Sequence, residues 1–292
     1  MSLFAIMLVL LSATIHAGWN LLAHSRQVNG NLFFLLHLIT AIVGFLPVLI
    51  AELTGTSFPL SVWGLLILSG MFQALYFLGL TMGYRYGNFT VVYPVARALP
   101  VLFLAVVDIS RNRVPSLLGW LGILLVTIGC LLAPLQSLRK ITISAYWNRT
   151  TVWIIVIMCG TVGYTTVGKV AAELLPSGAG TAARYGVLEA TFTLPFLWLF
   201  LKWVGEPINK LEKLADWKWA SIFALLIFCS YWLMLWAYQI SPYISYLTAL
   251  RQFSIVIGVV TASFIFKEPA PILRISAAIM ITLGIFCIGQ AQ

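Results

Sequence analysis

Two arginines, Arg97 and Arg251, lie deep inside apolar stretches of the sequence, 154 residues apart. Two tyrosines, Tyr76 and Tyr231, precede them and are 155 residues apart. A guanidinium stays charged and presents five N–H donors in a planar fork, which suits carboxylate or phosphate groups. The matched spacing indicates an internal repeat with an anion anchor in each half. The alternative is that each arginine pairs with backbone carbonyls or extends toward a membrane surface.

The composition places these arginines in an apolar chain. Of 292 residues, 61% are hydrophobic and 9% are charged, whereas soluble domains carry about 25% charged residues. A net charge of +9 arises mostly from short connections between apolar runs, so it predicts membrane orientation and no nucleic-acid partner. Four cysteines fall inside apolar runs without metal or redox spacing, and no cofactor is expected.

Apolar runs of about 20 residues, the length of a helix that crosses a bilayer, follow one another along the whole chain. They are continuous rather than alternating, which favours helices over barrel strands. The first run has no basic leader or cleavage site, so we expect it to be retained. The ten predicted spans are Leu3–Ala23, Asn31–Ala51, Val62–Met82, Phe89–Val107, Leu117–Ala133, Val152–Val170, Ala182–Leu201, Trp219–Tyr238, Tyr243–Phe266 and Ile272–Ile288.

The predicted fold is an all-α integral membrane protein with ten transmembrane helices in two five-helix repeats. The first repeat covers residues 1–134, a basic linker covers 135–151, and the second repeat covers 152–292. Five spans are an odd number, so the second repeat is predicted to be inverted relative to the first. Inverted repeats are typical of secondary transporters, whose binding sites lie near the middle of the membrane.

The basic residues predict an orientation through the positive-inside rule. Of 17 lysines and arginines, eleven lie in the connections after spans one, three, five, seven and nine, and two lie in the opposite connections. This distribution makes the basic loops cytoplasmic and places both termini outside. The protein is therefore expected in a plasma or inner membrane.

Further side chains extend the predicted substrate site. Gln73 and Tyr76 share one helical stripe, and Tyr231 lies on the equivalent stripe of the second repeat. Tyr93 lies one turn before Arg97 on the same helix face. These side chains could form cavity walls that stack on a ligand and offer polar groups to it. Ordinary helix packing is the alternative.

Proton coupling has two candidates, His16 and Glu189. An imidazole titrates near neutral pH, and Glu189 is the one carboxylate well inside a predicted span. Trp19 and Asn20 lie one turn beyond His16 and complete the predicted substrate-binding residues. A packing role for His16, and a local pair between Glu189 and Arg184, are the alternatives.

Two other titratable side chains lie within or at the end of spans. His37 could carry a proton in the same way as His16, but packing is the favoured interpretation. Lys169 ends the sixth run, and we expect it to extend to the membrane interface.

Several blocks resemble EamA-domain proteins of the drug/metabolite transporter superfamily. The stretch His16–Ala23 resembles the opening helix of that family, and the block Pro94–Pro100 resembles its fourth helix. The junction Phe266–Pro269, followed by a helix that contains Gly284, is similar to the usual end of the family's repeat. The resemblance covers essentially the whole chain as two EamA repeats. It implies a ten-helix secondary transporter of small metabolites, often an exporter.

The sequence departs from the family pattern in three respects. Arg111–Pro115 stands where a glutamate is usual. Small multidrug-resistance relatives carry a glutamate eight residues before a lysine on the first helix, whereas here His16 stands eight before His24. Without that carboxylate, antiport of cationic drugs is disfavoured. Many relatives also have both termini in the cytoplasm, which conflicts with the charge distribution.

The leading prediction is a secondary transporter that exports small organic metabolites by alternating access. Its expected substrates are amino acids or other anionic or zwitterionic solutes. Its partners would be the small-molecule substrate, the lipid bilayer and protons, and its state a monomer or weak homodimer. No ATP-binding loop is present, so an ion or solute gradient or a partner subunit must supply energy. A lipid flippase and a membrane enzyme remain alternatives, although the sequence has no HExxH or Gly-x-Ser-x-Gly motif.

Overall fold

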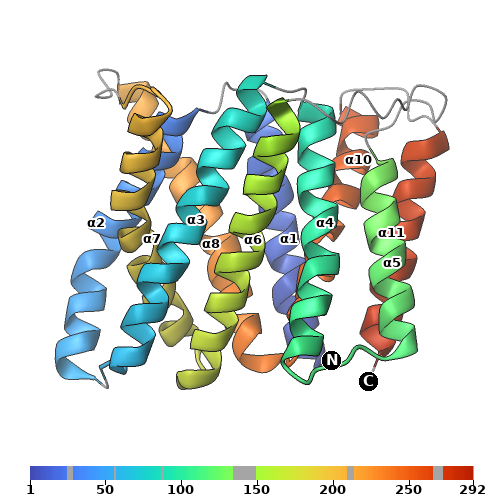
Figure 1. Cartoon of the computed structure of the whole chain (residues 1–292), viewed down its shortest axis with the longest axis horizontal. Helices are drawn as coiled ribbons and strands as arrows, with labels where there is room; N and C mark the ends of the chain where they lie inside the picture. Colours follow the sequence, from blue (N-terminus) through green and yellow to red (C-terminus); the bar gives the residue numbers. More distant parts are fainter. Residues whose placement is uncertain are drawn as a thin grey trace.

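The computed structural model describes residues 1–24, 29–55, 57–86, 89–133, 149–208, 214–265 and 272–291. Most of the predicted linker 135–151 and the junction Phe266–Pro269 lie outside these ranges. Helices fill nearly all of the described chain (Figure 1). They are α1 (Leu3–His24), α2 (Gly30–Thr54), α3 (Leu60–Tyr86), α4 (Phe89–Ser110), α5 (Leu117–Leu132), α6 (Arg149–Leu174), α7 (Ala179–Trp203), α8 (Leu214–Ile240), α9 (Ile244–Arg251), α10 (Phe253–Ile265) and α11 (Ile272–Gln290).

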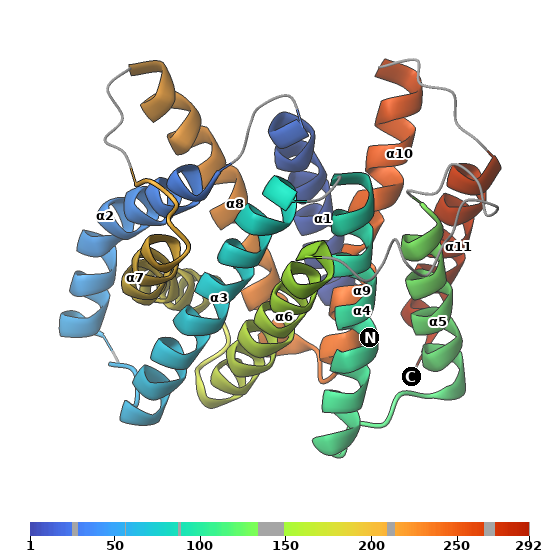
Figure 2. The same ribbon diagram turned by 45° about the horizontal axis from the view of Figure 1, so that its top comes forward.

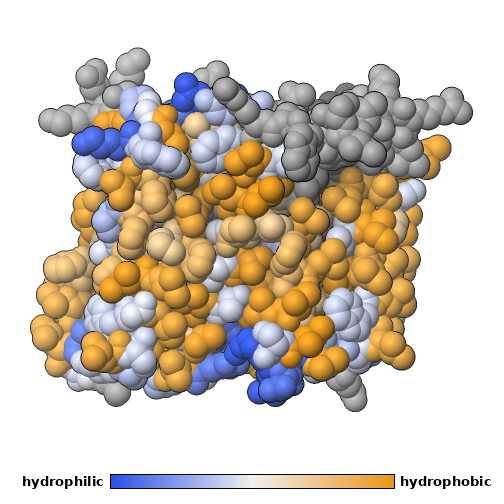
Figure 3. Space-filling view, in the orientation of Figure 1, coloured by the Kyte–Doolittle hydropathy of each residue, from blue (hydrophilic) through white to orange (hydrophobic). Residues whose placement is uncertain are grey.

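The helices are those of a multi-pass membrane protein. Apolar side chains form a broad band across the visible face, and hydrophilic residues gather toward its upper and lower edges (Figure 3). Seven stretches of the described residues are long and apolar enough to cross a membrane. They are Leu3–Leu22, Gly30–Thr54, Leu60–Tyr86, Thr150–Leu174, Trp217–Ile240, Ile244–Thr261 and Ile272–Gln290. The seven do not include α4, α5 or α7, so ten crossings stay a prediction.

The ninth predicted span, Tyr243–Phe266, contains a stretch long and apolar enough to cross a membrane, Ile244–Thr261, but it is not one continuous helix. It is divided at Gln252 into α9 and α10. The backbone N–H of Gln252 donates to the carbonyls of Ala249 and Leu250 instead of continuing the regular α-helical pattern. The Gln252 side chain donates from Nε2 to the Thr248 carbonyl and accepts from Arg97 Nε on α4. The break therefore lies where the chain contributes polar groups to the interior.

Helices from the two halves pack against each other in pairs. Helix α1 of the first half packs on α8 of the second half, and α3 of the first half packs on α6 of the second. The pair α2 and α7 lies at one end of the molecule, and the pair α5 and α11 lies at the other (Figures 1 and 2). The middle is occupied by α1, α3, α4, α6, α8 and α9, and these helices position the candidate site.

Glycines bring α5 and α11 into close contact. A Cβ atom added to Gly122 would lie 2.7 Å from the Gly284 carbonyl oxygen, and one added to Gly284 would lie 2.7 Å from that of Gly122. A Cβ atom added to Gly129 would lie 2.9 Å from the Ala277 carbonyl oxygen. Small residues allow this approach of two backbones, which replaces the hydrophobic effect as a source of attraction between helices in lipid.

Gly122→Ala is expected to destabilise the protein by about 1–3 kcal/mol, because the new methyl group has to push α11 away. The measurement is thermal unfolding of the purified protein in detergent. Gly64→Ala is the matched control, since a Cβ atom there meets no heavy atom within 4 Å. Equal unfolding temperatures for the two variants would contradict the close contact.

The two ends of the chain lie together at one edge of the bundle (Figure 1). The terminal ammonium group of Met1 donates to the Ala291 carbonyl at 3.4 Å. Both termini are therefore on the same side of the molecule.

Candidate functional site

A central cavity of about 90 Å³ lies where the helices of the two halves meet. Its walls come from α1, α2, α3 and α4 of the first half and from α6, α7, α8 and α9 of the second, with Gln252 between α9 and α10. The volume is small beside the 300–1,000 Å³ typical of sites for drug-sized ligands, so it suits a small solute.

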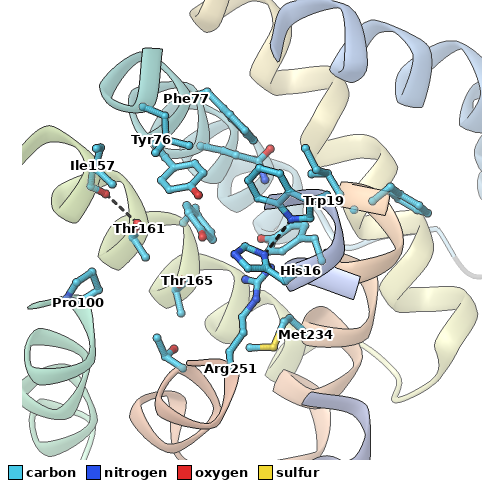
Figure 4. Close-up of a pocket in the computed structure, with 18 of the residues that line it drawn as sticks. His16, Trp19, Tyr76, Phe77, Pro100, Ile157, Thr161, Thr165, Met234 and Arg251 are labelled. Atoms are coloured by element: carbon cyan, nitrogen blue, oxygen red, sulfur yellow. Dashed lines mark hydrogen bonds between the residues drawn. The ribbon is translucent and has the colours of Figure 1, made fainter. Parts of the chain in front are cut away.

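The two repeat-matched arginines meet at one histidine in this cavity. Arg97 of α4 contacts Nε2 of His16 through Nη1, and Arg251 of α9 approaches Nδ1 of the same ring through Nη2 at 3.2 Å. Trp19 Nε1 donates to Nδ1 at 3.1 Å. Figure 4 shows the Arg251 side chain extending from its helix toward the His16 ring, with the Trp19 hydrogen bond drawn. The sequence repeat therefore places its two cations in one site.

The hydrogen-bond donors around His16 exceed the acceptors that its ring offers. A neutral imidazole has one N–H donor and one acceptor nitrogen, and an imidazolium has no acceptor. If Nδ1 accepts from Trp19 and Arg251, the proton is on Nε2 and faces an N–H of Arg97. In the other tautomer, Nδ1–H faces two donors. Each form of the ring therefore leaves donor facing donor at this point.

Other groups of the second half hold the arginines in place. Arg97 donates from Nε to Gln252 Oε1 at 2.9 Å and from Nη2 to Ser254 Oγ at 3.0 Å. Arg251 donates from Nη2 to Ser230 Oγ at 3.3 Å, while its buried Nε has no partner among the described residues. Both side chains thus point into the protein, and neither extends to a membrane surface.

Three tyrosine rings form a ladder along the cavity wall. Tyr164 of α6 lies edge-on to Tyr76 of α3 and edge-on to Tyr231 of α8, with ring centroids 5.7 Å apart in both contacts. Phe77 extends the ladder through an edge contact with Tyr76 at 5.0 Å. Such edge-to-face contacts stabilise a rigid aromatic surface. The repeat-matched tyrosines therefore lie on one continuous wall that joins the two halves.

Glu189 lies beside the cavity and is fully buried. Ser69 of α3 donates to its Oε1, and the hydroxyl of Tyr231 lies close to the same carboxyl group. No ion pair within the described residues involves Glu189, and the ion pair of Arg184 is with Glu52 at 3.1 Å. The local Arg184–Glu189 pair considered from the sequence is therefore not present. A carboxyl group buried without a cation is most stable when protonated.

The remaining predicted residues are placed as follows. Gln73 lines the cavity, and its Oε1 accepts from Thr193 at 2.8 Å. Trp19 also lines it, whereas Asn20 donates from Nδ2 to the His16 carbonyl and is only half-buried. The Tyr93 side chain lies outside the described residues. His37 lines the cavity while its Nδ1 is 2.7 Å from the Phe33 carbonyl oxygen, which satisfies that nitrogen.

Two oppositely charged side chains contact the end of α8 and the start of α9, on either side of the connection between these helices. The ammonium group of Lys169 donates to the carbonyls of Tyr238 and Ser241 at 2.6 and 2.7 Å, at the end of α8. The carboxylate of Asp108 accepts from the backbone N–H groups of Ile244 and Ser245 at 3.1 and 2.9 Å, at the start of α9. Each charge complements the partial charge of the helix end that it contacts.

The expectation that Lys169 extends to the membrane interface was wrong. Its side chain is 3% exposed. Besides the two carbonyls it forms an ion pair with Glu173 at 3.2 Å, and Glu173 also pairs with Arg111. Burial is favourable here because every N–H of the ammonium group has an acceptor.

Lys169→Met is expected to destabilise the protein by about 2–6 kcal/mol, because two buried carbonyls lose their donor at about 1–3 kcal/mol each. Thermal unfolding in detergent measures the change. Lys218→Met is the matched control, since Lys218 is exposed in the first turns of the same helix that Lys169 caps. An unchanged unfolding temperature for Lys169→Met would contradict the capping role.

Sequence reasoning missed three residues that shape this region. Tyr164 stands in the polar group Tyr164–Thr166 inside an apolar run, and that interruption was a usable signal. Asp108 follows directly on the fourth predicted span and was assigned to a connection, although it is fully buried. Gln252 follows Arg251 directly, but its contact with Arg97 depends on the tertiary fold.

The described residues include no group of three His, Cys, Asp or Glu side chains placed to hold a metal ion. The polar groups of the cavity are instead guanidinium, imidazole, amide and hydroxyl groups. This arrangement can bind an organic solute by hydrogen bonds and charge.

Comparison with known proteins supports the fold. No protein-family model and no curated protein matches the sequence. Among solved structures 27 chains match. One of them, a crystal structure of a protein, aligns over 98% of this chain and 98% of its own, with a TM-score of 0.67 and 17% sequence identity. A likeness at this identity shows a shared fold over the full length of both chains and carries no information on function.

Proposed function

We propose that this protein is a secondary transporter that moves small anionic or zwitterionic organic solutes across a membrane by alternating access. The observation that carries the proposal is the meeting of Arg97 and Arg251, from matched positions in the two halves, at His16 in a central cavity. Charges inside a membrane bundle usually mark a substrate or ion pathway.

In this proposal the chain crosses the membrane ten times, as two inverted five-helix repeats. The exchange of packing partners between halves supports it: α1 packs on α8 as α3 packs on α6, and α2, α4 and α5 pack on α7, α9 and α11. An inverted repeat with a site at its interface permits rocking of one half against the other.

The acidic group of the solute would bind the two guanidinium groups, and its body would lie along the tyrosine ladder. Binding displaces the donor–donor contact at His16, because an oxyanion accepts where the ring cannot.

Protons are the proposed coupling ion, with Glu189 as their carrier. The carboxyl group lies one residue from Ala190, which lines the cavity, and close to the hydroxyl of Tyr231, which lines it too. Loss of its proton would leave a buried charge without a cation, so its protonation state and the position of the surrounding helices are linked.

The blocks that resemble EamA proteins of the drug/metabolite transporter superfamily agree with this proposal in fold and in function. We place the protein in a plasma or inner membrane as a monomer or weak homodimer, with the basic connections in the cytoplasm. Export is the proposed direction. Catalysis is not part of the proposal.

The test is solute flux in proteoliposomes that contain the purified protein. Vesicles preloaded with a candidate solute are diluted into labelled solute, and counterflow is followed with time. Uptake above that of protein-free vesicles, saturable and competed by unlabelled solute, is expected. If every solute stabilises the protein without crossing the membrane, a binding or sensing role replaces transport.

A further inference from the structure

We infer that the cavity selects an organic anion without an ammonium group, and so discriminates against zwitterions such as amino acids. This inference rests on the proposed transport function and narrows its substrate class. The substrate would carry a carboxylate or phosphate oxyanion on a small, largely apolar body. Three observations carry the inference: the charge of the lining, the unsatisfied donors and the engagement of the amide oxygens.

The charge of the lining is positive. Two guanidinium groups contribute to it, and none of the residues that form the cavity wall in the described structure is a carboxylate. Glu189 lies behind the wall, where Ser69 donates to it. An oxyanion would neutralise part of this charge, whereas an ammonium group would add a third cation within the same site. Positive charges within one small cavity repel one another strongly where water is excluded.

Hydrogen-bond donors outnumber acceptors around the His16 ring. Each tautomer of His16 leaves at least one N–H of its three neighbours without a lone pair on the ring. The buried Nε of Arg251 adds another donor with no acceptor in the described residues. Buried donors without acceptors are costly. An oxyanion has several lone pairs and would supply the acceptors that these donors lack.

The two amide oxygens of the cavity wall already accept hydrogen bonds, whereas the Tyr231 hydroxyl in the wall and Oε2 of Glu189 behind it have no partner among the described residues. Oε1 of Gln73 accepts from Thr193, and Oε1 of Gln252 accepts from Arg97. The hydroxyls of Thr161 and Thr40 donate to the Ile157 and Leu36 carbonyls within their own helices, so their oxygens keep acceptor lone pairs. An ammonium group has three donors that need acceptors. The described wall offers it little beyond hydroxyl oxygens and aromatic rings.

The experiment compares trios of solutes that share one side chain and differ in charge, each made of an amino acid, the acid that lacks its ammonium group and the amine that lacks its carboxylate. The first trio is 3-phenylpropionate, phenylalanine and phenethylamine, and the second is propionate, alanine and ethylamine. Phenyl phosphate is added to separate a phosphate site from a carboxylate site. Affinity for the purified full chain is measured in detergent by calorimetry, and flux of each bound solute is measured in proteoliposomes. The expected result is that the anion of at least one trio binds ten times or more tighter than its zwitterion.

A variant tests whether the arginine causes the preference. Arg251→Gln is expected to reduce anion affinity tenfold or more and to leave the weaker zwitterion affinity within a factor of about three. Arg113→Gln, which changes an exposed arginine, is the control and is expected to retain both affinities. If Arg251→Gln does not fold, the comparison within each trio for the unaltered protein decides alone.

The inference and the transport function fail in different ways. A zwitterion or amine that binds as tightly as its matched anion, or a panel in which no anion binds, would overturn the inference. Flux of a zwitterion with no flux of anions would overturn it while transport stands. Tight anion binding with no flux of any solute would overturn transport and leave the anion preference intact.

Discussion

Arg97→Ala and Arg251→Ala are each expected to abolish measurable solute flux in proteoliposomes at micromolar substrate. A hydrogen bond to a charged group contributes about 1.5–3 kcal/mol, so each truncation should weaken binding by about 10- to 150-fold. Loss of one guanidinium group also changes the surroundings of the other, because both groups contact His16. Binding is measured by calorimetry and flux by counterflow.

The control for both variants is Arg113→Ala, which removes an exposed arginine from the connection after α4. Size-exclusion profiles and unfolding temperatures show whether each variant folds. Arg251→Ala is expected to fold well, because the partners that it loses are neutral groups, Ser230 and His16. Full flux by both cavity variants, with correct folding, would rule out the anion-anchor role.

Glu189→Gln is expected to uncouple transport from protons. A glutamine keeps the shape of the side chain and still accepts from Ser69, but it cannot bind and release a proton. A pH difference of one unit is worth about 1.4 kcal/mol per proton, which drives about tenfold accumulation with one proton per solute. In the variant this accumulation should disappear, while counterflow at equal pH continues.

The measurement is solute accumulation in proteoliposomes with an imposed pH difference and a clamped membrane potential. Glu206→Gln is the matched control, because Glu206 lies just beyond α7 and pairs with Arg85 at a partly exposed site. Its loss should leave accumulation unchanged, as isolated surface ion pairs contribute little. Accumulation by Glu189→Gln equal to that of the unaltered protein would assign proton coupling elsewhere.

The helices could be predicted from the sequence because apolar runs of membrane length are long and continuous. Apart from the break in the ninth run, the predicted runs are helical over nearly all of their described residues, including Phe89–Val107 and Ala182–Leu201. The division of the ninth run was not predictable, since Gln252 has no glycine or proline beside it. Its position follows from Arg97 on another helix, which supplies a partner for the polar side chain.

The site was predictable to the extent that the repeat marked it. Arg97, Arg251, Tyr76 and Tyr231 could be selected from equal spacing, and they lie around one cavity. Whether they bind a substrate stays a prediction. The role of His16 between two cations, and of Tyr164 between two tyrosines, depends on how six helices cross. Spacing along the chain does not encode such crossings.

Lys169 and Asp108 show the same limit from the other direction. A lysine at the end of an apolar run usually reaches water, and an aspartate just after a run usually lies in a loop. Both are buried here because the ends of α8 and α9 offer exposed carbonyl and N–H groups. Local sequence contains no sign of these acceptors and donors, which belong to residues 69 to 137 positions away.

Asp108 has a mechanical consequence for the two cations. It belongs to α4, the helix of Arg97, and it grips the first turn of α9, the eight-residue helix that ends at Arg251. As long as these hydrogen bonds hold, we expect a tilt of α4 to move the start of α9 with it, so that Arg97 and Arg251 would move as a pair across the interface of the two halves. A solute bound by both arginines would then keep its two contacts while the cavity closes on one side of the membrane and opens on the other.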